Sequence, residues 1–523
     1  MISFHSNILN KNYIHIIIIS LFSFLINFYY SKFGSFPIDT FLHYDSAVRI
    51  LNNEYPVRDY WIVSGIVVDL IQSIFFKILG VNWFAYTFHS SLFNLVISIA
   101  TYYFFLSLGL NKINSLIYTL CFATLAYTIS GTPFVDHHAS FFLLLATYLI
   151  IHALKTPKKN YLWFFVVILF FLSFLSKQVP FAYVFFSQSV ILLYVFIKNK
   201  YFNIVKTIFI SSAILTVFFL ISLSYLNINF NDFYIQYIEY PKSIGEKRYF
   251  SLNNSLESFF NQYKFLIFPI MIIFIIKCNK IMNKKLDLHS KEIISFLIIL
   301  TLGASLILHQ LLTKNQIYIY FLIPVFFALL ESNLINLTKN LKKYCSFTII
   351  IFLIVITFKY HLRYNETRKF HELENVNLKN SIKSEIIDPS LGGLFWLNPM
   401  YKNAPKNEIL ILKSAISRLE KTKPNIMFFT NYLFLDSITT KNLNNPNKCF
   451  TKDGTCFPIK GNKFYKNYKD FIKNKIKRKK IKKIYFFRHE KIDYQIIEEY
   501  LSQNCYSYDT DDLFHIYEIN CLK

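Results

Sequence analysis

The chain has 523 residues, of which 54% are apolar and 19% aromatic, while only 17% are charged. With a positive mean hydropathy, this balance excludes an ordinary water-soluble globule and an intrinsically disordered chain. Gly and Pro are scarce, at 11 and 14 residues, which excludes a collagen-like chain. The net charge of +25 reflects 56 Lys and Arg against 31 Asp and Glu. The composition predicts a multi-span membrane protein.

Apolar runs broken by short basic loops fill the chain up to about residue 360, and the remainder has the composition of a soluble domain. We therefore expect an α-helical polytopic membrane domain at 1–360, with a long first outer loop at 32–83. A soluble extracytoplasmic α/β domain is expected at 361–523. Its predicted elements are a helix at 407–421, strands at 425–432 and 483–489, a helix near 493–503 and a strand at 513–519.

An apolar helix of about 17 to 25 residues can cross a bilayer, because it rises about 1.5 Å per residue. About eleven runs of this kind are present: 13–31, 84–108, 113–131, 138–154, 160–177, 179–197, 207–226, 259–277, 293–313, 315–331 and 344–358. The stretch 66–79 also has a helical pattern, but Asp69, Gln72 and Lys77 interrupt it. It is expected to lie in the membrane interface.

The loops on one side of these spans are strongly basic. If the N-terminus is cytoplasmic, the inner connections hold sixteen lysines and only three acids, as the positive-inside rule requires. An odd number of spans then places the C-terminal domain outside the cytoplasm. The run at 13–31 is predicted to be an uncleaved anchor, and the protein is expected in a multi-pass cell membrane, such as a bacterial inner membrane.

Four of the seven cysteines lie in the C-terminal domain, at Cys449, Cys456, Cys505 and Cys521. An even number of cysteines in an oxidising compartment is typical of disulfides. We expect Cys449 to pair with Cys456 and Cys505 with Cys521, since both pairs close short loops. Four free buried thiols remain the alternative.

A lysine-rich run occupies 473–483. A solvated helix face is the simpler interpretation, and contact with anionic lipid headgroups or a phosphorylated acceptor is the functional one. Nucleic acid is not expected as a partner, because a domain outside the cytoplasm does not routinely meet it.

Two acidic residues in predicted outer loops are candidate catalytic residues. Asp45 lies in the long first loop, and Asp136 lies in a very short second loop that holds its side chains against the helix ends. Charged groups at a span's edge are costly and are usually functional, so both acids are expected to face one interfacial cleft. The structural alternatives are N-caps, with Asp45 capping a helix SAVRIL and Asp136 capping a span that starts at His138.

These residues resemble a known family. The string HYDSAVRILNNEYPVRDYW, with the following helix that ends FFKILG, is similar to the first outer loop of membrane-embedded GT-C glycosyltransferases. That group includes dolichyl-phosphate-mannose protein mannosyltransferases and the bacterial aminoarabinose lipid A transferase. LSFLSKQVPF and IYIYFLIPVFFAL resemble further family segments, so the likeness covers residues 1 to about 360. The C-terminal domain departs from the mannosyltransferases.

The resemblance implies a glycosyltransferase with a polyprenyl-phosphate-linked sugar as donor. It also implies inverting transfer at the outer face of the membrane, to a lipid, glycan or protein acceptor. Asp45 matches the catalytic acid of the first loop, and Asp136 matches the acid of the second. Independently of the family, such a transfer needs a base for the acceptor proton and cations for the leaving phosphate.

The candidate phosphate-binding residues are Lys177, Arg58 and Lys314, of which Lys177 follows an apolar span. Its alternative role is to snorkel to the headgroups. Supporting roles are expected for four further residues: Asp59, His137, His138 and Gln178. No cofactor is required. A divalent metal held by His137 and His138 with Asp136 is possible but unsupported, since adjacent side chains in one turn rarely converge on one ion and the sequence shows no third ligand.

A polytopic transporter or lipid flippase is the alternative function. It predicts charges or helix breaks at the midplane of the spans and an inverted repeat, and the sequence has neither feature. A structural or sensing membrane protein is a third possibility, but it leaves the long acidic first loop unexplained.

Overall fold

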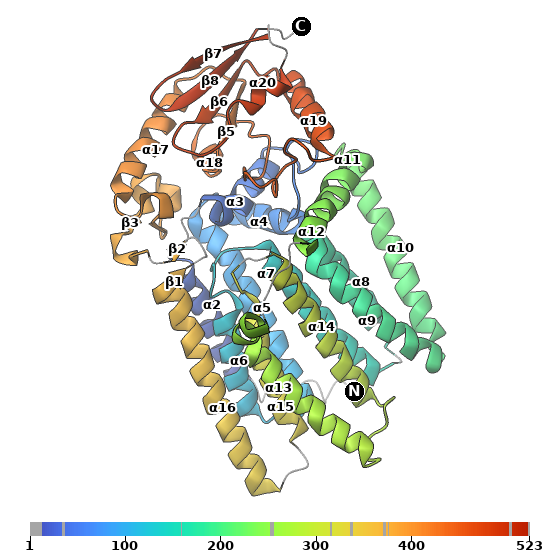
Figure 1. The fold of residues 1–523 in the computed structure, drawn as a ribbon. Coiled ribbons are helices and arrows are strands. Elements are labelled where there is room, and N and C mark those ends of the chain that lie inside the picture. Colours follow the sequence, from blue (N-terminus) through green and yellow to red (C-terminus); the bar gives the residue numbers. More distant parts are fainter. Residues whose placement is uncertain are drawn as a thin grey trace. The chain divides into compact units, whose positions relative to one another are not determined.

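The computed structural model describes residues 13–33, 37–157, 159–250, 256–313, 316–334, 338–369, 373–374, 376–501 and 505–520. Across these residues the protein is mostly helical, with a small β-sheet near the C-terminus (Figure 1). The predicted combination of a helical membrane-like region and a small C-terminal sheet domain is therefore confirmed.

Among the described residues, eight helices are long and apolar enough to cross a membrane, judged by length and composition. They are α2 (Tyr13–Tyr30), α5 (Trp83–Ser107), α7 (Val135–Lys155), α9 (Gln178–Lys198), α10 (Phe202–Tyr225), α13 (Leu256–Met282), α14 (Lys291–Thr313) and α16 (Lys339–Leu362). The shorter apolar helices are α6 (Lys112–Ala126), α8 (Tyr161–Ser176) and the continuous η2 and α15 (Ile319–Asn333). Each of the eleven predicted segments thus contains an apolar helix. Eleven crossings stay a prediction, because the three short helices rise at most about 24 Å.

The chain divides into two compact units. The helical unit comprises Met1–Lys32, Thr87–Val217 and Ser251–Glu374, and the sheet unit comprises Phe33–Tyr86, Phe218–Phe250 and Asn375–Lys523. The predicted first outer loop therefore folds with the C-terminal region, a grouping that a single boundary at residue 360 does not anticipate. Hydrogen bonds explain it: Trp61 N donates to the Pro446 carbonyl at 2.8 Å, and Arg49 Nη2 donates to the Asn445 carbonyl at 2.5 Å.

The helical unit is held together by buried polar side chains as well as apolar packing. Helices α7, α8, α9 and α14 lie side by side (Figure 1). Gln188 on α9 donates to Thr147 Oγ1 on α7 at 3.0 Å and to the Ile298 carbonyl on α14 at 3.1 Å. On α14, Gly303 lies where a Cβ would come within 2.7 Å of the Phe326 ring. Such small residues and interhelical hydrogen bonds are typical of helix packing in a bilayer.

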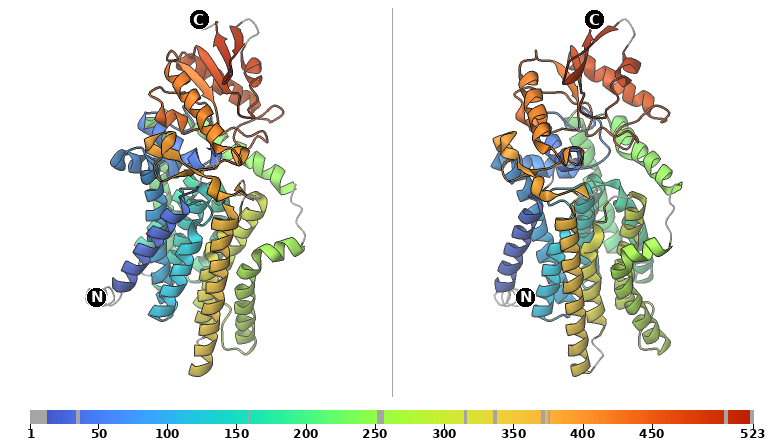
Figure 2. Two further views of the ribbon diagram at one scale, coloured as in Figure 1. Left: turned by 90° about the vertical axis from the view of Figure 1, so that its left-hand side faces the viewer. Right: turned by 60° about the vertical axis from the view of Figure 1, so that its left-hand side comes forward.

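The sheet unit is built on four strands, β5 (Ile426–Phe429), β6 (Lys483–Phe487), β7 (Tyr506–Thr510) and β8 (Phe514–Ile519), in the order β5-β6-β8-β7. β5 and β6 are parallel, and the other pairs are antiparallel. Helix α17 (Pro405–Glu420) packs on one face through Leu412 and Phe428, and α19 (Tyr465–Arg478) packs on the other through Ile472 and Phe429. Figure 2 shows both helices beside the sheet.

The predicted strands and the helix α17 are confirmed, and the predicted helix near 493–503 is the shorter α20 (Ile496–Tyr500). Strand β7 was not predicted, because this edge strand is largely exposed and its sequence, YSYDT, carries no apolar run. The remaining short strands are β1 (Arg368–Lys369) with β2 (Leu373–Glu374) and β3 (Ile382–Lys383) with β4 (Phe395–Trp396).

Two helices form the first predicted outer loop, α3 (Pro37–Leu51) and α4 (Ile66–Leu79). The helical prediction for 66–79 is therefore confirmed. α3 starts eight residues before Asp45, which places Asp45 in mid-helix, so the alternative in which it caps a helix SAVRIL is wrong. The sheet unit also includes the helices α11 (Phe230–Tyr234), η1 (Ile235–Glu239) and α12 (Tyr240–Phe250).

The lysine-rich run at 473–483 is more than a solvated helix face. Lys475 is buried and donates to the Asp59 carbonyl at 2.6 Å, Arg478 contacts Asp59 Oδ1 at 2.8 Å, and Lys479 contacts Glu54 Oε1 at 2.7 Å. Part of the run therefore supplies the counter-charge for acids of the first loop.

Candidate functional sites

Three titratable side chains meet at one end of the helical unit. Asp136 lies in the first turn of α7, Lys177 caps α8, and His309 lies in the last turns of α14. Lys177 Nζ is 2.7 Å from Asp136 Oδ1 and 2.8 Å from Oδ2, and His309 Nε2 is 2.6 Å from Oδ1. Asp136 and His309 are each 1% exposed, whereas Lys177 is 19% exposed. Lys177 is thus the accessible member of the cluster.

This geometry removes two simpler interpretations. Helix α7 begins at Val135 with Phe134 as its cap, so Asp136 is not the N-cap of a helix that starts at His138. The ammonium group of Lys177 binds a buried carboxylate, which differs from simple snorkelling. Because both oxygens of Asp136 are engaged, the geometry favours Asp136 as a positioning residue for Lys177. His309 was not predicted, since its signal in the sequence is a polar His-Gln pair in an otherwise apolar span.

The two histidines after Asp136 point in different directions. His137 stacks on Tyr127 with ring centroids 4.9 Å apart, and neither of its buried ring nitrogens has a hydrogen-bond partner. His138 Nε2 lies 3.1 Å from His89 Nε2, and its Nδ1 lies 3.0 Å from the Phe134 carbonyl. In the part of the chain that the structure describes, no group of three His, Cys, Asp or Glu is arranged to hold a metal ion.

The second candidate site surrounds Asp45 in the sheet unit. Its side chain is 1% exposed, and neither carboxylate oxygen has a hydrogen-bond partner. The nearest cation is Arg49, whose Nη1 lies 3.6 Å from Asp45 Oδ2 and also lacks a hydrogen bond. Burial raises the pKa of Asp45 to about 8; Arg49 opposes this rise, and the Asp436 carboxylate adds to it. Once ionised, a carboxylate with so high a pKa is a stronger base than an ordinary aspartate, and neither of its oxygens is engaged in a hydrogen bond.

Arg49 is held in place from three sides. Its Nε contacts Glu54 Oε2 at 3.2 Å, its Nη2 donates to the Asn445 carbonyl at 2.5 Å, and its guanidinium carbon lies 3.9 Å from the centre of the Tyr60 ring. These contacts leave only Nη1 directed at Asp45. Although burial opposes it, the cations around Glu54, beginning with Arg49, hold the pKa of Glu54 well below its ordinary value.

A buried triad in the same unit was not predicted, and its member His43 lies two residues before Asp45. Asp69 on α4 contacts His43 Nδ1 and Lys448 Nζ, each at 2.6 Å. All three side chains are at most 3% exposed. Burial lowers the pKa of Lys448, while Asp69 opposes this shift. The triad links α3 and α4 to Lys448, the residue before Cys449. It also accounts for the buried acid Asp69 in α4.

The remaining predicted residues have different surroundings. Asp59 accepts from Arg58 at 2.7 Å and from Arg478 at 2.8 Å. Arg58 also donates to the Leu226 carbonyl at 2.9 Å, so both residues take part in internal contacts. Gln178 follows Lys177 as the first residue of α9 and is half-buried. Lys314 lies outside the described residues.

Cys449 and Cys456 form a disulfide, the pairing that we predicted from loop length. Cys505 is also disulfide-bonded, and its predicted partner Cys521 lies outside the described residues. The remaining cysteines, in or beside the spans, are free: Cys121, Cys278 and Cys345.

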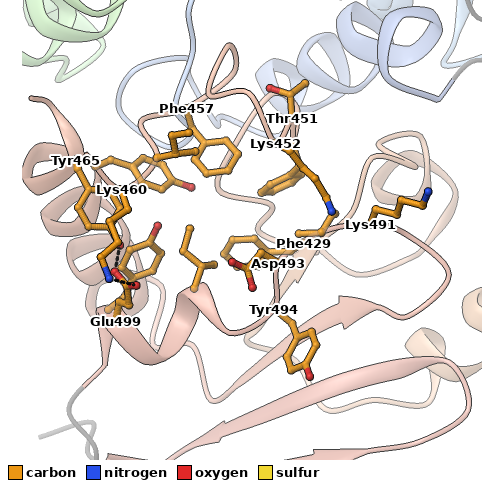
Figure 3. A pocket seen from close by; sticks show the side chains of 16 residues that line it. Phe429, Thr451, Lys452, Phe457, Lys460, Tyr465, Lys491, Asp493, Tyr494 and Glu499 are labelled. Carbon is orange, nitrogen blue, oxygen red and sulfur yellow. Dashed lines mark hydrogen bonds and ion pairs between the residues drawn. The ribbon is translucent and has the colours of Figure 1, made fainter. Parts of the chain in front are cut away.

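A cavity of about 580 Å³ lies in the C-terminal part of the sheet unit (Figure 3). Aromatic rings make up much of its wall, including those of Phe429, Phe457 and Tyr465, and Lys452 and Asp493 add charge. An apolar wall with a few polar groups is typical of small-molecule sites. No motif in the sequence pointed to this cavity.

Comparison of the chain with protein-family models finds no match, and comparison with curated proteins finds none either. The resemblance to GT-C enzymes therefore rests on the quoted segments alone and stays a prediction.

Proposed function

We propose that the protein is a membrane glycosyltransferase that moves a sugar from a polyprenyl-phosphate donor to a lipid, glycan or protein acceptor. The observation that carries the proposal is the Asp45 carboxylate. It is buried, lacks a hydrogen bond on either oxygen, and has its pKa raised by burial to about 8. A group that only stabilises the fold would be expected to have its oxygens satisfied.

In the proposed step, the acceptor hydroxyl gives its proton to Asp45 while its oxygen forms a bond to the anomeric carbon of the sugar. The bond from this carbon to the phosphate oxygen breaks, and its electron pair leaves with the polyprenyl phosphate. Attack from the face opposite the phosphate inverts the anomeric configuration. Because Asp45 is 1% exposed, the substrate reaches it only when neighbouring segments move.

The leaving phosphate needs a cation. Within the sheet unit, Arg49 Nη1 is the candidate, since it lies beside Asp45 and makes no hydrogen bond. Within the helical unit, Lys177 remains the candidate that the sequence predicts, with Asp136 fixing its ammonium group. Arg58 is less suited, because Asp59 and the Leu226 carbonyl already bind its guanidinium.

The arrangement of charge favours an enzyme over a transporter. The cluster of Asp136, Lys177 and His309 lies at helix ends, and not at the centre of a span, where transporters place their substrate sites. The proposed placement is a multi-pass cell membrane with a cytoplasmic N-terminus and an extracytoplasmic C-terminal domain.

The test uses membranes that contain the full chain, supplied with labelled polyprenyl-phosphate sugars. We expect donor consumption and release of polyprenyl phosphate. Asp45→Asn should lower the transfer rate by roughly 10²-fold or more while leaving the protein level unchanged. Asp512→Asn, at an exposed carboxylate of the same unit, is the matched control. If no donor of this class is consumed, the function is not glycosyl transfer. If Asp45→Asn is as active as the control, Asp45 is not the base.

A further inference from the structure

A second cavity, of about 490 Å³, lies within the helical unit, and its wall is strongly cationic. Five lysines and one carboxylate line it: Lys155, Lys277, Lys280, Lys285, Lys291 and Glu292. They come from the last residue of α7, the end of α13, the loop that follows α13 and the start of α14. One acid cannot neutralise five lysines, so the cavity carries an excess of positive charge.

The contacts inside the cavity leave most of this charge available. Lys277 is 5% exposed and pairs with Glu292 Oε1 at 2.8 Å, and Lys280 reaches the same oxygen only at 3.6 Å. Lys155 donates to the Ser107 carbonyl at 3.2 Å, which orients but does not neutralise it. Five lysines that line one cavity with a single carboxylate among them form a site for an anion.

The position of the cavity along the helices indicates which kind of anion it binds. Asp136 and Lys155 lie at opposite ends of α7, about 29 Å apart at the usual rise per residue, and Lys291 and His309 lie about 27 Å apart on α14. The hydrocarbon core of a bilayer is about 30 Å thick. The lysine cavity and the Asp136 cluster are therefore separated by about one membrane thickness. The level of the cavity rests on the proposed placement of the Asp136 cluster at the outer face, which would put the cavity at the lipid phosphates of the opposite face.

Its wall also has an apolar part that suits a lipid. Leu108, Leu286 and Phe296 line the same cavity as the lysines. A free phosphate ion has no apolar atoms to bury against such a surface. The glycerol and first acyl carbons of a phospholipid would be buried there favourably. We propose that this cavity binds the headgroup of an anionic phospholipid, with Lys280, Lys285 and Lys291 contacting its phosphate.

The experiment uses the full chain in neutral detergent, with equal amounts of dioleoylphosphatidylglycerol and dioleoylphosphatidylcholine, and native mass spectrometry to count retained lipids. We expect selective retention of phosphatidylglycerol. The triple variant Lys280→Gln, Lys285→Gln, Lys291→Gln should lower that selectivity by roughly tenfold or more. The matched control replaces three exposed lysines elsewhere in the helical unit, Lys198→Gln, Lys200→Gln and Lys206→Gln, and should keep the selectivity.

Glu292→Gln should change the lipid selectivity in the direction opposite to the lysine variants. It removes the one carboxylate among the described residues that line the cavity and releases Lys277 and Lys280, so selectivity for phosphatidylglycerol should rise. A purely structural role for Glu292 predicts no such rise. Equal loss of selectivity in the two triple variants would overturn the proposal, because the attraction would then be diffuse. Displacement of the lipid by millimolar inorganic phosphate would assign the site to a soluble phosphate instead.

Discussion

His309 Nε2 lies 2.6 Å from Asp136 Oδ1, although the two residues are 173 positions apart in the chain. The same carboxylate binds Lys177 through both oxygens. One acid thus connects α7, α14 and the end of α8.

We expect the Asp136 and Lys177 side chains to be strongly coupled. Lys177→Met leaves a buried carboxylate with only His309, which should destabilise the protein by about 3 kcal/mol. Asp136→Asn should also destabilise it. The double variant should lose clearly less unfolding free energy than the two single variants lose in sum. Unfolding temperatures in detergent measure this, and simple additivity would show that the pair does not interact.

Sugar transfer should depend on pH through Asp45. Only the ionised carboxylate accepts a proton, and its pKa is raised to about 8, so kcat/KM should rise with pH and level off above about pH 8. Asp45→Asn should lose this dependence together with most of the rate. A rate that falls as pH rises towards 8 would instead identify Asp45 as a proton donor.

Asp45→Asn should stabilise the protein, and the gain should grow with pH. The folded state keeps the Asp45 proton up to about pH 8, while the unfolded chain releases it near pH 4. Between these values the folded state binds more protons, so Asp45 makes the protein less stable as pH rises, by at most about 1.4 kcal/mol per pH unit. Unfolding temperatures of both proteins at pH 5 and pH 8 test this, and an equal difference at both pH values would contradict it.

The Cys449–Cys456 disulfide closes a short loop. Replacing both cysteines with Ser should destabilise the sheet unit by about 2 to 3 kcal/mol in the chain-entropy model. Peptide mapping without reduction should recover the two cysteines in one linked peptide. Complete alkylation of both in the unreduced protein would refute the bond. The free residues Cys278 and Cys345 serve as internal controls for alkylation.

The predicted orientation can be read from reporter fusions. Fusions after Asn199 and Lys284 should report the cytoplasm, because the loops on that side carry the excess of lysine. A fusion after Lys421, in the sheet unit, should report the opposite compartment. A cytoplasmic signal from Lys421 would contradict both the topology and the expectation that Cys449 and Cys456 meet an oxidising environment.

The apolar helices and most of the C-terminal sheet domain could be predicted from the sequence. Hydrophobic runs and alternation are local properties, so segments such as 66–79 and 407–421 correspond to α4 and α17. The basic ends of the spans and the Cys449–Cys456 pair follow from local spacing in the same way. An edge strand with little burial, such as β7, carries no such pattern.

Only the tertiary structure decided which charges meet. Nothing in the sequence near Asp136 indicates His309, and nothing near Asp69 indicates Lys448, because each pair depends on how distant segments pack. The start of α3 at Pro37 placed Asp45 within a helix, and folding then buried it without a hydrogen-bond partner. Burial and ion pairing determine how stable an ionised side chain is. Both depend on contacts between residues that are distant in the chain, so they cannot be read from the local sequence.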